Sequence, residues 1–499
     1  MPVIAGVDSS TQSTKVVLRD ADDGAVLGLG KAPHPPTYPP VSEQDPERWW
    51  DALIDALASA VDQAGVSARD IAAISIAAQC HGLVPLDANG TVIRRAKLWN
   101  DTSTSPQMQR LRELIPSEQW ADRVGTVPTA AFTVSKLAWL ADNEPANFAR
   151  LSSVLLPHDW LTWKLTGRRV TDRSEASGTA YFNADDGKYD FEILSLIDPD
   201  RDWASMLPTV LRPAEPAGLV TVEAAERLGL RRDVVVGPGA GDQHASALGL
   251  GVGAGTLVYS LGTSGVVFTV SPNPVHDASG FIDGVADANG GYLPLVSTLN
   301  AAKVTDTVAR LLGVDHDELS ALALAAPARD DRAVMAAYLD GERSPDRPGA
   351  RGTITGISTE TTREELARAA YEGVVFGLYR GQLALEAAHI ATAGPLIAVG
   401  GGAASPAYLQ VLANTTSREV FTALAVQPVA MGAAVQAAAV AAGTGIDEIR
   451  DAWAPTLTSA AAPRSDTPSA AAYERYLQVA DWRAGDSGDE GESSVGRTE

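Results

Sequence analysis

The sequence predicts an α/β protein built from two related lobes. Its 499 residues are enough for two domains of roughly 200–250 residues each. Residues 7–13, followed by a strand at 15–19, resemble residues 259–265, followed by a strand at 266–270. Both segments are predicted as strand, small polar turn, strand. A duplicated fold with one such hairpin in each lobe explains this similarity, and a chance match between Ser/Thr-rich turns is the alternative.

In the first half, strands are expected to come before helices. The predicted strands cover 3–7, 15–19, 25–30 and 71–78. Asp45-Pro46-Glu47 predicts the start of a helix, because the aspartate can cap it, proline suits the first helical position and the glutamate faces the helix dipole. A hairpin is expected over 83–94, turning at Asn89-Gly90. Residues 103–165 are expected to be rich in helix.

The second half is predicted to hold further strands and a larger share of helix. Its predicted strands cover 234–236, 256–260, 266–270 and 396–399. Helices are expected at 406–414 and 431–442. Residues 484–499 are rich in Gly, Ser and acidic residues and have no apolar periodicity, so we expect a disordered acidic tail there.

The charge balance argues against several classes of partner. Acidic residues outnumber basic ones, 62 to 39, which gives a formal net charge of −23. Such a surface repels phosphate backbones and anionic lipids, so we expect no nucleic acid and no membrane as partner. The single cysteine, Cys80, cannot form an internal disulfide, and the first residues lack the pattern of a signal peptide. We therefore expect a soluble protein of the cytoplasm.

The turns of the two predicted hairpins favour phosphate binding. They are rich in Ser, Thr and Gly, whose small side chains and N–H groups allow a polyphosphate to come close. The sequence contains no G-x-x-x-x-G-K-[ST] loop, so a nucleotide would be held by the two hairpins, with Lys15 adding a positive charge. Asp8 is expected to associate with Mg²⁺ through water, and a turn-capping aspartate is the alternative.

Asp242 is the candidate general base. It follows Gly239-Ala240-Gly241 at a strand end, where the glycines allow a sharp bend and a close substrate. A carboxylate there can take the proton of an attacking hydroxyl group in phosphoryl transfer. Ordinary turn formation by aspartate is the alternative. His244 is expected to form local hydrogen bonds rather than to act in catalysis.

A polyhydroxylated ligand is predicted near the carboxyl end of strand 71–78. Gln79-Cys80-His81-Gly82 follows this strand, at the edge where ligands bind in open α/β sheets. Trp99-Asn100-Asp101 adds an aromatic face and a carboxylate that can accept hydrogen bonds from hydroxyl groups. A satisfied core histidine and a buried tryptophan are the alternatives. Cys80 and one histidine are too few for a metal site.

Taken together, these motifs resemble the FGGY family of carbohydrate kinases over about residues 3–480. The runs that carry the resemblance, in family order, are Gly6–Thr11 with Lys15, Ser42–Trp50, Gln79–Gly82, Leu98–Asp101, Leu155–Leu161, Gly241-Asp242, Ser260–Gly265, Gly341–Pro345 and Gly352–Ile357. Within the family, the chain is most similar to enzymes that phosphorylate D-xylulose. It departs from their common pattern at Cys80, where Met is usual, at Gln243, where Asn is usual, and at Gln427 and Pro428.

The resemblance implies two actin-like lobes of the ribonuclease H type, at 1–240 and 241–483, with ATP and a sugar in the cleft between them. It also implies that Asp242 is the catalytic base, that Asp8 is a second catalytic carboxylate, and that both lie beside Mg²⁺. The residues implied to contact the sugar are Gln79, Cys80, His81, Trp99, Asp101, Asp242 and Gln243. Those implied to contact ATP are Thr11, Lys15, Gly262, Thr263, Asn300, Gly401, Gly402 and Ala403.

We therefore predict an ATP-dependent kinase that converts a ketopentose, D-xylulose, to its 5-phosphate. Its expected partners are a small sugar and a nucleotide, and a homodimer is the assembly that we consider. The alternatives are an FGGY kinase for ribulose, fuculose, a pentitol or glycerol, and a non-catalytic actin-like scaffold that binds a nucleotide.

Overall fold

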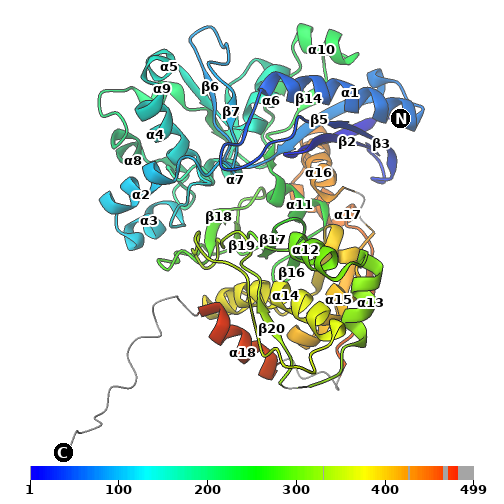
Figure 1. The fold of residues 1–499 in the computed structure, drawn as a ribbon. Coiled ribbons are helices and arrows are strands. Elements are labelled where there is room, and N and C mark those ends of the chain that lie inside the picture. Colours follow the sequence, from blue (N-terminus) through cyan, green and yellow to red (C-terminus); the bar gives the residue numbers. More distant parts are fainter. Residues whose placement is uncertain (1, 330, 425–426, 465–469, 482–499) are drawn as a thin grey trace, which may run out of the picture.

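The computed structural model describes residues 2–329, 331–424, 427–464 and 470–481, and it consists of two α/β lobes (Figure 1). Each lobe is built around a seven-stranded sheet. The predicted two-lobe α/β architecture is confirmed. The tail predicted at 484–499 lies outside the described residues. None of the helices in the described ranges has the length and apolarity needed to cross a bilayer.

The strands of the first sheet are β1 (Val3–Ser9), β2 (Ser13–Asp20), β3 (Val26–Pro33), β5 (Ile71–Ala78), β13 (Gly218–Leu219), β14 (Val235–Val236) and β15 (Ala240–Gly241). Their order is β13-β14-β5-β1-β2-β3, and β15 pairs with β5. All residues of β1 are buried, as expected for a strand covered on both faces. β1 pairs antiparallel with β2 and parallel with β5.

The strands of the second sheet are β16 (Leu257–Leu261), β17 (Gly265–Phe268), β18 (Asp283–Ala286), β19 (Tyr292–Thr298), β22 (Leu396–Val399), β23 (Val420–Ala423) and β24 (Leu457–Ala461). Their order is β18-β19-β17-β16-β22-β23-β24. Here β16 pairs antiparallel with β17 and parallel with β22. Since β1 has the same relation to β2 and β5, the two sheets repeat one topology, and the predicted duplication is present in the fold.

The helices that cover the first sheet are α1 (Pro46–Ala64) and α16 (Pro428–Ala442). α1 packs against β2 and β3, where Gly28 and Gly30 leave room for its backbone. α16 packs against β1 and β5, where Gly6 leaves room in the same way. Gly6 pairs with Val17, and Val17 pairs with Leu29, so Gly6 lies on the face opposite to Gly28 and Gly30. A helix from late in the chain thus covers one face of the first sheet.

Two local predictions can be compared directly with the structure. α1 begins as expected: Asp45 accepts a hydrogen bond from the backbone N–H of Glu47 (3.1 Å), and Pro46 is the first helical residue. The hairpin predicted at 83–94 is also confirmed: Leu86 and Val92 form an antiparallel bridge, and the N–H groups of Asp87 and Ile93 donate to the carbonyls of Thr91 and Pro85 (both 2.9 Å). The sequence did not predict that β6 (Val84–Leu86) also pairs with β8 (Ser153–Leu155). Turn chemistry gives no information about a partner strand so far along the chain.

The segment between β5 and β13 forms a helix-rich insertion, as predicted. Its helices are α2 (Ser105–Leu114), α3 (Ser117–Val124), α4 (Thr133–Asn143), α5 (Pro145–Arg150), α6 (Pro157–Thr166), α7 (Arg173–Ser177), α8 (Phe191–Ser195) and α9 (Trp203–Met206). Trp120, Phe132 and Tyr181 are buried in a separate apolar core of this insertion. The insertion also contacts the second lobe, because the N–H of Gly284 donates to the carbonyl of Gly125 (2.9 Å).

The helices of the second lobe include α14 (Arg363–Ala387), whose start is capped by Thr362 and Glu365. The remaining helical elements are η1 (Ala68–Asp70) and α10 (Val222–Leu228), which pack in the first lobe, and α11 (Asp242–Gly249), α12 (Ala302–Leu312), α13 (His316–Ala325), the 3₁₀ turn η2 (Gly401–Ala404), α15 (Pro406–Thr416), α17 (Ile446–Ala452) and α18 (Ala470–Asp481). Short paired strands complete the fold: β4 (Glu43–Gln44), β7 (Ala96–Lys97), β9 (Val170–Asp172), β10 (Phe182–Asn183), β11 (Lys188–Tyr189), β12 (Thr209–Leu211), β20 (Val334–Ala336) and β21 (Thr353–Thr355).

α11 links the two lobes. It packs along α16 on the first sheet and begins at Asp242 (Figure 1). The buried Gln436 of α16 donates from its amide to the carbonyl of Gly239 (3.0 Å) and accepts from the Ser75 hydroxyl (3.2 Å). α16 therefore fixes the bend that leads into Asp242.

Candidate active site

The first hairpin holds a buried ion pair. Asp8 near the end of β1 lies opposite Lys15 on β2, and its Oδ2 is 3.0 Å from the Lys15 Nζ. Its other carboxylate oxygen accepts a hydrogen bond from the Ser10 hydroxyl. The side chain of Asp8 is buried, whereas Lys15 remains partly exposed. The hairpin therefore presents a fixed carboxylate and a cation that a ligand can reach.

Asp242 is held at the first position of α11. Gly239 has a φ of 87°, and a side chain on it would lie 2.8 Å from the carbonyl oxygen of Ile76, so this bend requires glycine. The Oδ1 of Asp242 accepts from the backbone N–H of Gln243 (2.7 Å) and from the Cys80 thiol (3.5 Å). Burial, followed by the negative charge of Asp8, raises the pKa of Asp242 to about 6. A carboxylate with a pKa near neutrality is suited to general-base catalysis.

Asp8 and Asp242 suit Mg²⁺. They are close enough for the charge of Asp8 to raise the pKa of Asp242, and the positive charge of Lys15 offsets that effect only in part. Mg²⁺ prefers carboxylate oxygens, keeps several waters and uses few protein ligands. A divalent cation beside the two carboxylates would relieve their repulsion. The residues therefore fit the predicted magnesium site.

His81 is placed as a neutral hydrogen-bonding group. Its backbone is left-handed, with a φ of 64°, and its Nδ1 is 2.6 Å from the carbonyl oxygen of Gly178. The ring packs on Phe132, with the centroids 4.7 Å apart. Burial, with the charges of Arg343 and Lys136, lowers the pKa of His81 well below its usual value. Because the neutral ring donates from Nδ1 to a carbonyl, its Nε2 is left as an acceptor for a ligand hydroxyl.

Thr11 connects the first hairpin to the predicted sugar residues. Its hydroxyl donates to the Oε1 of Gln79 (3.0 Å) and accepts from the indole N–H of Trp99 (3.0 Å). Gln44 joins the same network, because its amide donates to the carbonyl of Thr11 (2.9 Å). The structure thus brings Thr11, Gln79 and Trp99 together. The predicted contact between Thr11 and ATP stays a prediction, because in this arrangement its hydroxyl is already engaged on both sides.

Asp101 organises the loop around it. Its carboxylate is fully buried and accepts from the Lys97 ammonium (3.0 Å), the Ser42 N–H (3.0 Å) and the N–H of Ser103 (3.0 Å). The Ser103 hydroxyl is a fourth donor. Four donors saturate a carboxylate. That this group also accepts hydrogen bonds from sugar hydroxyls stays a prediction.

The second hairpin presents a neutral turn. Thr263 is exposed at its tip, and its carbonyl accepts from the N–H of Ala301 (3.3 Å). The carbonyl of Gly262 accepts from the N–H of Ala302 (2.9 Å), so the start of α12 supports the turn from behind. Asn300 is buried, and its amide donates to the carbonyl of Gly341 (2.7 Å) and to Glu342 (2.9 Å). The structure therefore shows Asn300 anchoring a loop, and its contact with ATP stays a prediction.

The glycines after β22 lie against the second hairpin. Gly400 has a φ of 86°, and a side chain on it would lie 2.8 Å from the carbonyl oxygen of Leu261. Gly401 is exposed, with no other atom near the position of a side chain, Gly402 is buried, and Ala403 is half-buried. A flat surface beside Gly262 is thus available, as a nucleoside would require.

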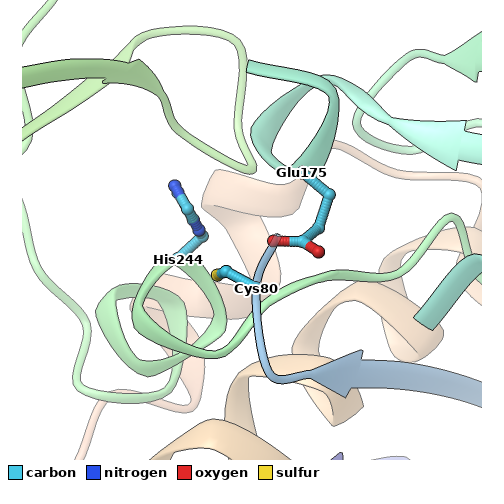
Figure 2. A group of neighbouring side chains, drawn as sticks. All are labelled: Cys80, Glu175 and His244. Carbon is cyan, nitrogen blue, oxygen red and sulfur yellow. The ribbon is translucent and has the colours of Figure 1, made fainter. Parts of the chain in front are cut away.

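Two polar residues beside Asp242 were not recognised as functional from the sequence. Glu175 on α7 and His244 on α11 lie next to Cys80 (Figure 2). The local hydrogen bonds expected for His244 are wrong: both of its ring nitrogens are buried without a hydrogen-bond partner among the described residues. Burial raises the pKa of Glu175 well above its usual value and lowers that of His244 to about 3. The sequence signal that was available is a glutamate within an otherwise small and polar run at 174–179.

The structure has two lobes of one topology, each with a strand–turn–strand hairpin, and a carboxylate pair lies beside the helix that links the lobes. These features define a carbohydrate kinase of the actin-like fold. Residues 3–249 match the N-terminal domain of the FGGY family of carbohydrate kinases, and residues 257–441 match the C-terminal domain of that family. The chain belongs to this family, which confirms the resemblance seen in the motifs. Its substrates are therefore a nucleotide and a sugar or polyol.

Individual relatives extend this assignment. The chain is 42% identical over 443 residues to a xylulose kinase of Streptomyces rubiginosus, which covers 89% of each protein. It is 41% identical over 453 residues to a xylulose kinase of Streptomyces coelicolor, which covers 91% of each. Among solved structures, the xylulose kinase from Bifidobacterium adolescentis aligns with a TM-score of 0.83 and 35% identity over 96% of this chain and 99% of that one.

Proposed function

We propose that this protein transfers the γ-phosphoryl group of ATP to the 5-hydroxyl group of D-xylulose and that Asp242 is the general base. The observation that carries the proposal is the position of Asp242 between the Asp8–Lys15 pair and the Cys80–His81 turn, with a pKa raised to about 6. The similarity to xylulose kinases over about nine-tenths of the chain supports the choice of sugar.

In this proposal, the residues on the sugar side have separate roles in proton transfer and in sugar binding. Asp242 takes the proton of the attacking hydroxyl group while its oxygen approaches the phosphorus in line. The Nε2 of His81 accepts a hydrogen bond from another sugar hydroxyl, and Trp99, held by Thr11, offers its face to the carbon skeleton. Gln79, which accepts from Thr11, and Gln243, the residue after the base, would contribute amide groups beside the sugar.

The nucleotide side is formed by both lobes. Lys15 and the N–H groups of the turn at Gly262-Thr263 stabilise charge on the phosphates. The surface at Gly401-Gly402-Ala403 receives the adenosine. Asp8 and Asp242 would hold Mg²⁺, which supplies charge neutralisation on the phosphates. Because the reaction uses ATP, we place it in the cytoplasm, and a homodimer remains an assembly to test by light scattering.

A coupled assay of ADP formation tests the proposal. D-Xylulose, D-ribulose, L-fuculose, xylitol, D-arabitol and glycerol are supplied in turn with Mg²⁺-ATP. We expect the highest kcat/KM with D-xylulose and no turnover without sugar. A higher value with glycerol or a pentitol would overturn the choice of substrate, and ATP hydrolysis that is indifferent to every sugar would favour the scaffold alternative.

A further inference from the structure

Cys80, Glu175 and His244 form a cluster of potential metal ligands, of which the proposed reaction involves only Cys80, through its contact with Asp242. They come from the turn after β5, from α7 and from α11, and Figure 2 shows their side chains converging. One donor atom from each, a sulfur, an oxygen and a nitrogen, lies within 4.8 Å of the other two.

The cluster is incomplete without a ligand. The side chain of Glu175 is fully buried and that of His244 is 4% exposed. Among the described residues, neither ring nitrogen of His244 has a hydrogen-bond partner, and no hydrogen bond of normal geometry reaches the carboxyl oxygens of Glu175, whose one close polar neighbour of the cluster is the Cys80 thiol. Buried polar groups in folded proteins are nearly always paired, and unpaired ones call for an explanation such as a missing ion.

Gly241 keeps the space between the three donor atoms open. A side-chain carbon on this residue would lie 2.6 Å from the Cys80 Sγ, 2.6 Å from the Glu175 Oε1 and 2.6 Å from the His244 Nδ1. Any residue other than glycine would therefore collide with all three atoms at once. The backbone of Gly241 instead forms one wall of a small polar pocket lined with sulfur, oxygen and nitrogen.

We propose that Cys80, Glu175 and His244 bind a thiophilic divalent cation of the Zn²⁺ type, and that the bound cation inhibits the kinase. Thiolate, imidazole and carboxylate are the ligands of tetrahedral Zn²⁺, with bonds of about 2.0–2.3 Å, whereas Mg²⁺ prefers oxygen alone. On binding, the S–H bond of Cys80 and the O–H bond of the protonated Glu175 carboxyl group break, both protons pass to water, and a sulfur–metal and an oxygen–metal bond form. A water or the Oδ1 of Asp242, 3.5 Å from the Cys80 Sγ, takes the fourth position.

Inhibition follows from the contact with Asp242 and rests on the proposed function. In the metal-bound state the Cys80 sulfur no longer donates a hydrogen bond to Asp242. The cation also lies beside the carboxylate that must accept the substrate proton.

Co²⁺ titration of the full-length protein tests the site without any substrate. Cys80 is the single cysteine of the chain, so a sulfur-to-cobalt charge-transfer band in the near ultraviolet can arise only from this residue. We expect one equivalent of Co²⁺ to produce the band, Zn²⁺ to remove it by displacement, and a large excess of Mg²⁺ to leave it unchanged. Absence of the band overturns the proposal.

Variants separate the three ligands. C80S should abolish the band, and E175Q and H244Q should each weaken Co²⁺ binding at least ~10-fold, because even an outer partner of a metal ligand contributes that much. The control is H316Q, since His316 is exposed and distant in sequence, and it should bind like the wild type. Each variant is scored only if its circular dichroism matches the wild type. Equal affinity in folded E175Q or H244Q overturns the three-residue site.

Activity gives the second readout. Zn²⁺ should inhibit the wild-type kinase at concentrations that displace Co²⁺, and excess Zn²⁺ should inhibit folded H244Q at least ~10-fold less strongly. Inhibition that is equal in both proteins overturns the regulatory part of the proposal. If the protein forms the cobalt band but phosphorylates no sugar, the metal site stands and the proposed function fails, so the two failures are distinguishable.

Discussion

The two hairpins share a backbone but differ in chemistry. In the first, Asp8 forms an ion pair with Lys15 at 3.0 Å, and Thr11 is bound to Trp99 and Gln79. In the second, Ser260 occupies the position of Asp8, and Thr263, which corresponds to Thr11, is exposed. One copy of the duplicated hairpin therefore carries charge and is hydrogen-bonded to residues predicted to contact the sugar. The other copy offers a neutral turn to a ligand.

The largest expected effect comes from Asp242, which lies outside both hairpins. D242N removes the base and keeps the shape of the side chain, so we expect kcat to fall about 10²–10⁴-fold with little change in sugar affinity. Steady-state kinetics and calorimetric titration of the sugar measure the two quantities. D233N, at an exposed aspartate, is the control, and near-normal kcat in D242N would place the base elsewhere.

The next prediction tests whether the charged Asp8 of the first hairpin matters more for activity than the neutral Ser260 of the second. D8N should lower kcat/KM about 10–100-fold and raise the Mg²⁺ concentration needed for half-maximal rate, because a charge-assisted interaction contributes roughly 1.5–3 kcal/mol. S260A, the matched change in the second hairpin, should alter kcat/KM less than about threefold. Similar losses in both variants would contradict the division of roles between the hairpins.

Thr11 and Thr263 test whether the two hairpins affect the KM of different substrates. T11A should raise the KM for sugar about 3–10-fold and leave that for ATP nearly unchanged, because it frees Trp99 and Gln79 from a neutral hydrogen-bond network. T263A should do the reverse. Initial rates over a grid of both substrates separate the two constants, and an ATP-specific effect of T11A would restore the phosphate role expected from the sequence.

The smallest effect is a shift in pH dependence. Asp242 must be deprotonated to act, so kcat/KM should rise with pH through about 6, the value to which burial and Asp8 raise its pKa. Removing the charge of Asp8 lowers that pKa, so the acidic limb of D8N should move to lower pH. A pH–rate profile of each protein checks the direction, and a shift toward higher pH would contradict it.

Sequence patterns predicted the elements that depend on local chemistry. The strands of both hairpins contain short apolar runs next to small polar turns, and the start of α1 has its own cap, so both were found within a few residues. The pairing of β6 with β8 was missed because it joins distant segments. Glu175 was missed for a related reason: only the packing of α7 against the Cys80 turn makes this glutamate unusual.

The resemblance identified the candidate residues but not how each is engaged. The resemblance assigns Asp101 and Asn300 to a ligand site, yet the carboxylate of Asp101 and the amide N–H₂ of Asn300 hold neighbouring loops. These hydrogen bonds depend on Lys97, which donates to Asp101, and on the loop at Gly341, which accepts from Asn300. The spacing of residues in the sequence predicts neither pairing. Motif position therefore predicts the neighbourhood of a ligand better than it predicts direct contact.

The packing of α16 has a consequence for how the protein is made. During synthesis the strands of the first sheet emerge early, but the helix that covers Gly6 begins only at Pro428. Until then one face of β1 and β5 lacks its covering helix, so the nascent N-terminal half exposes apolar surface that favours aggregation until α16 has been made.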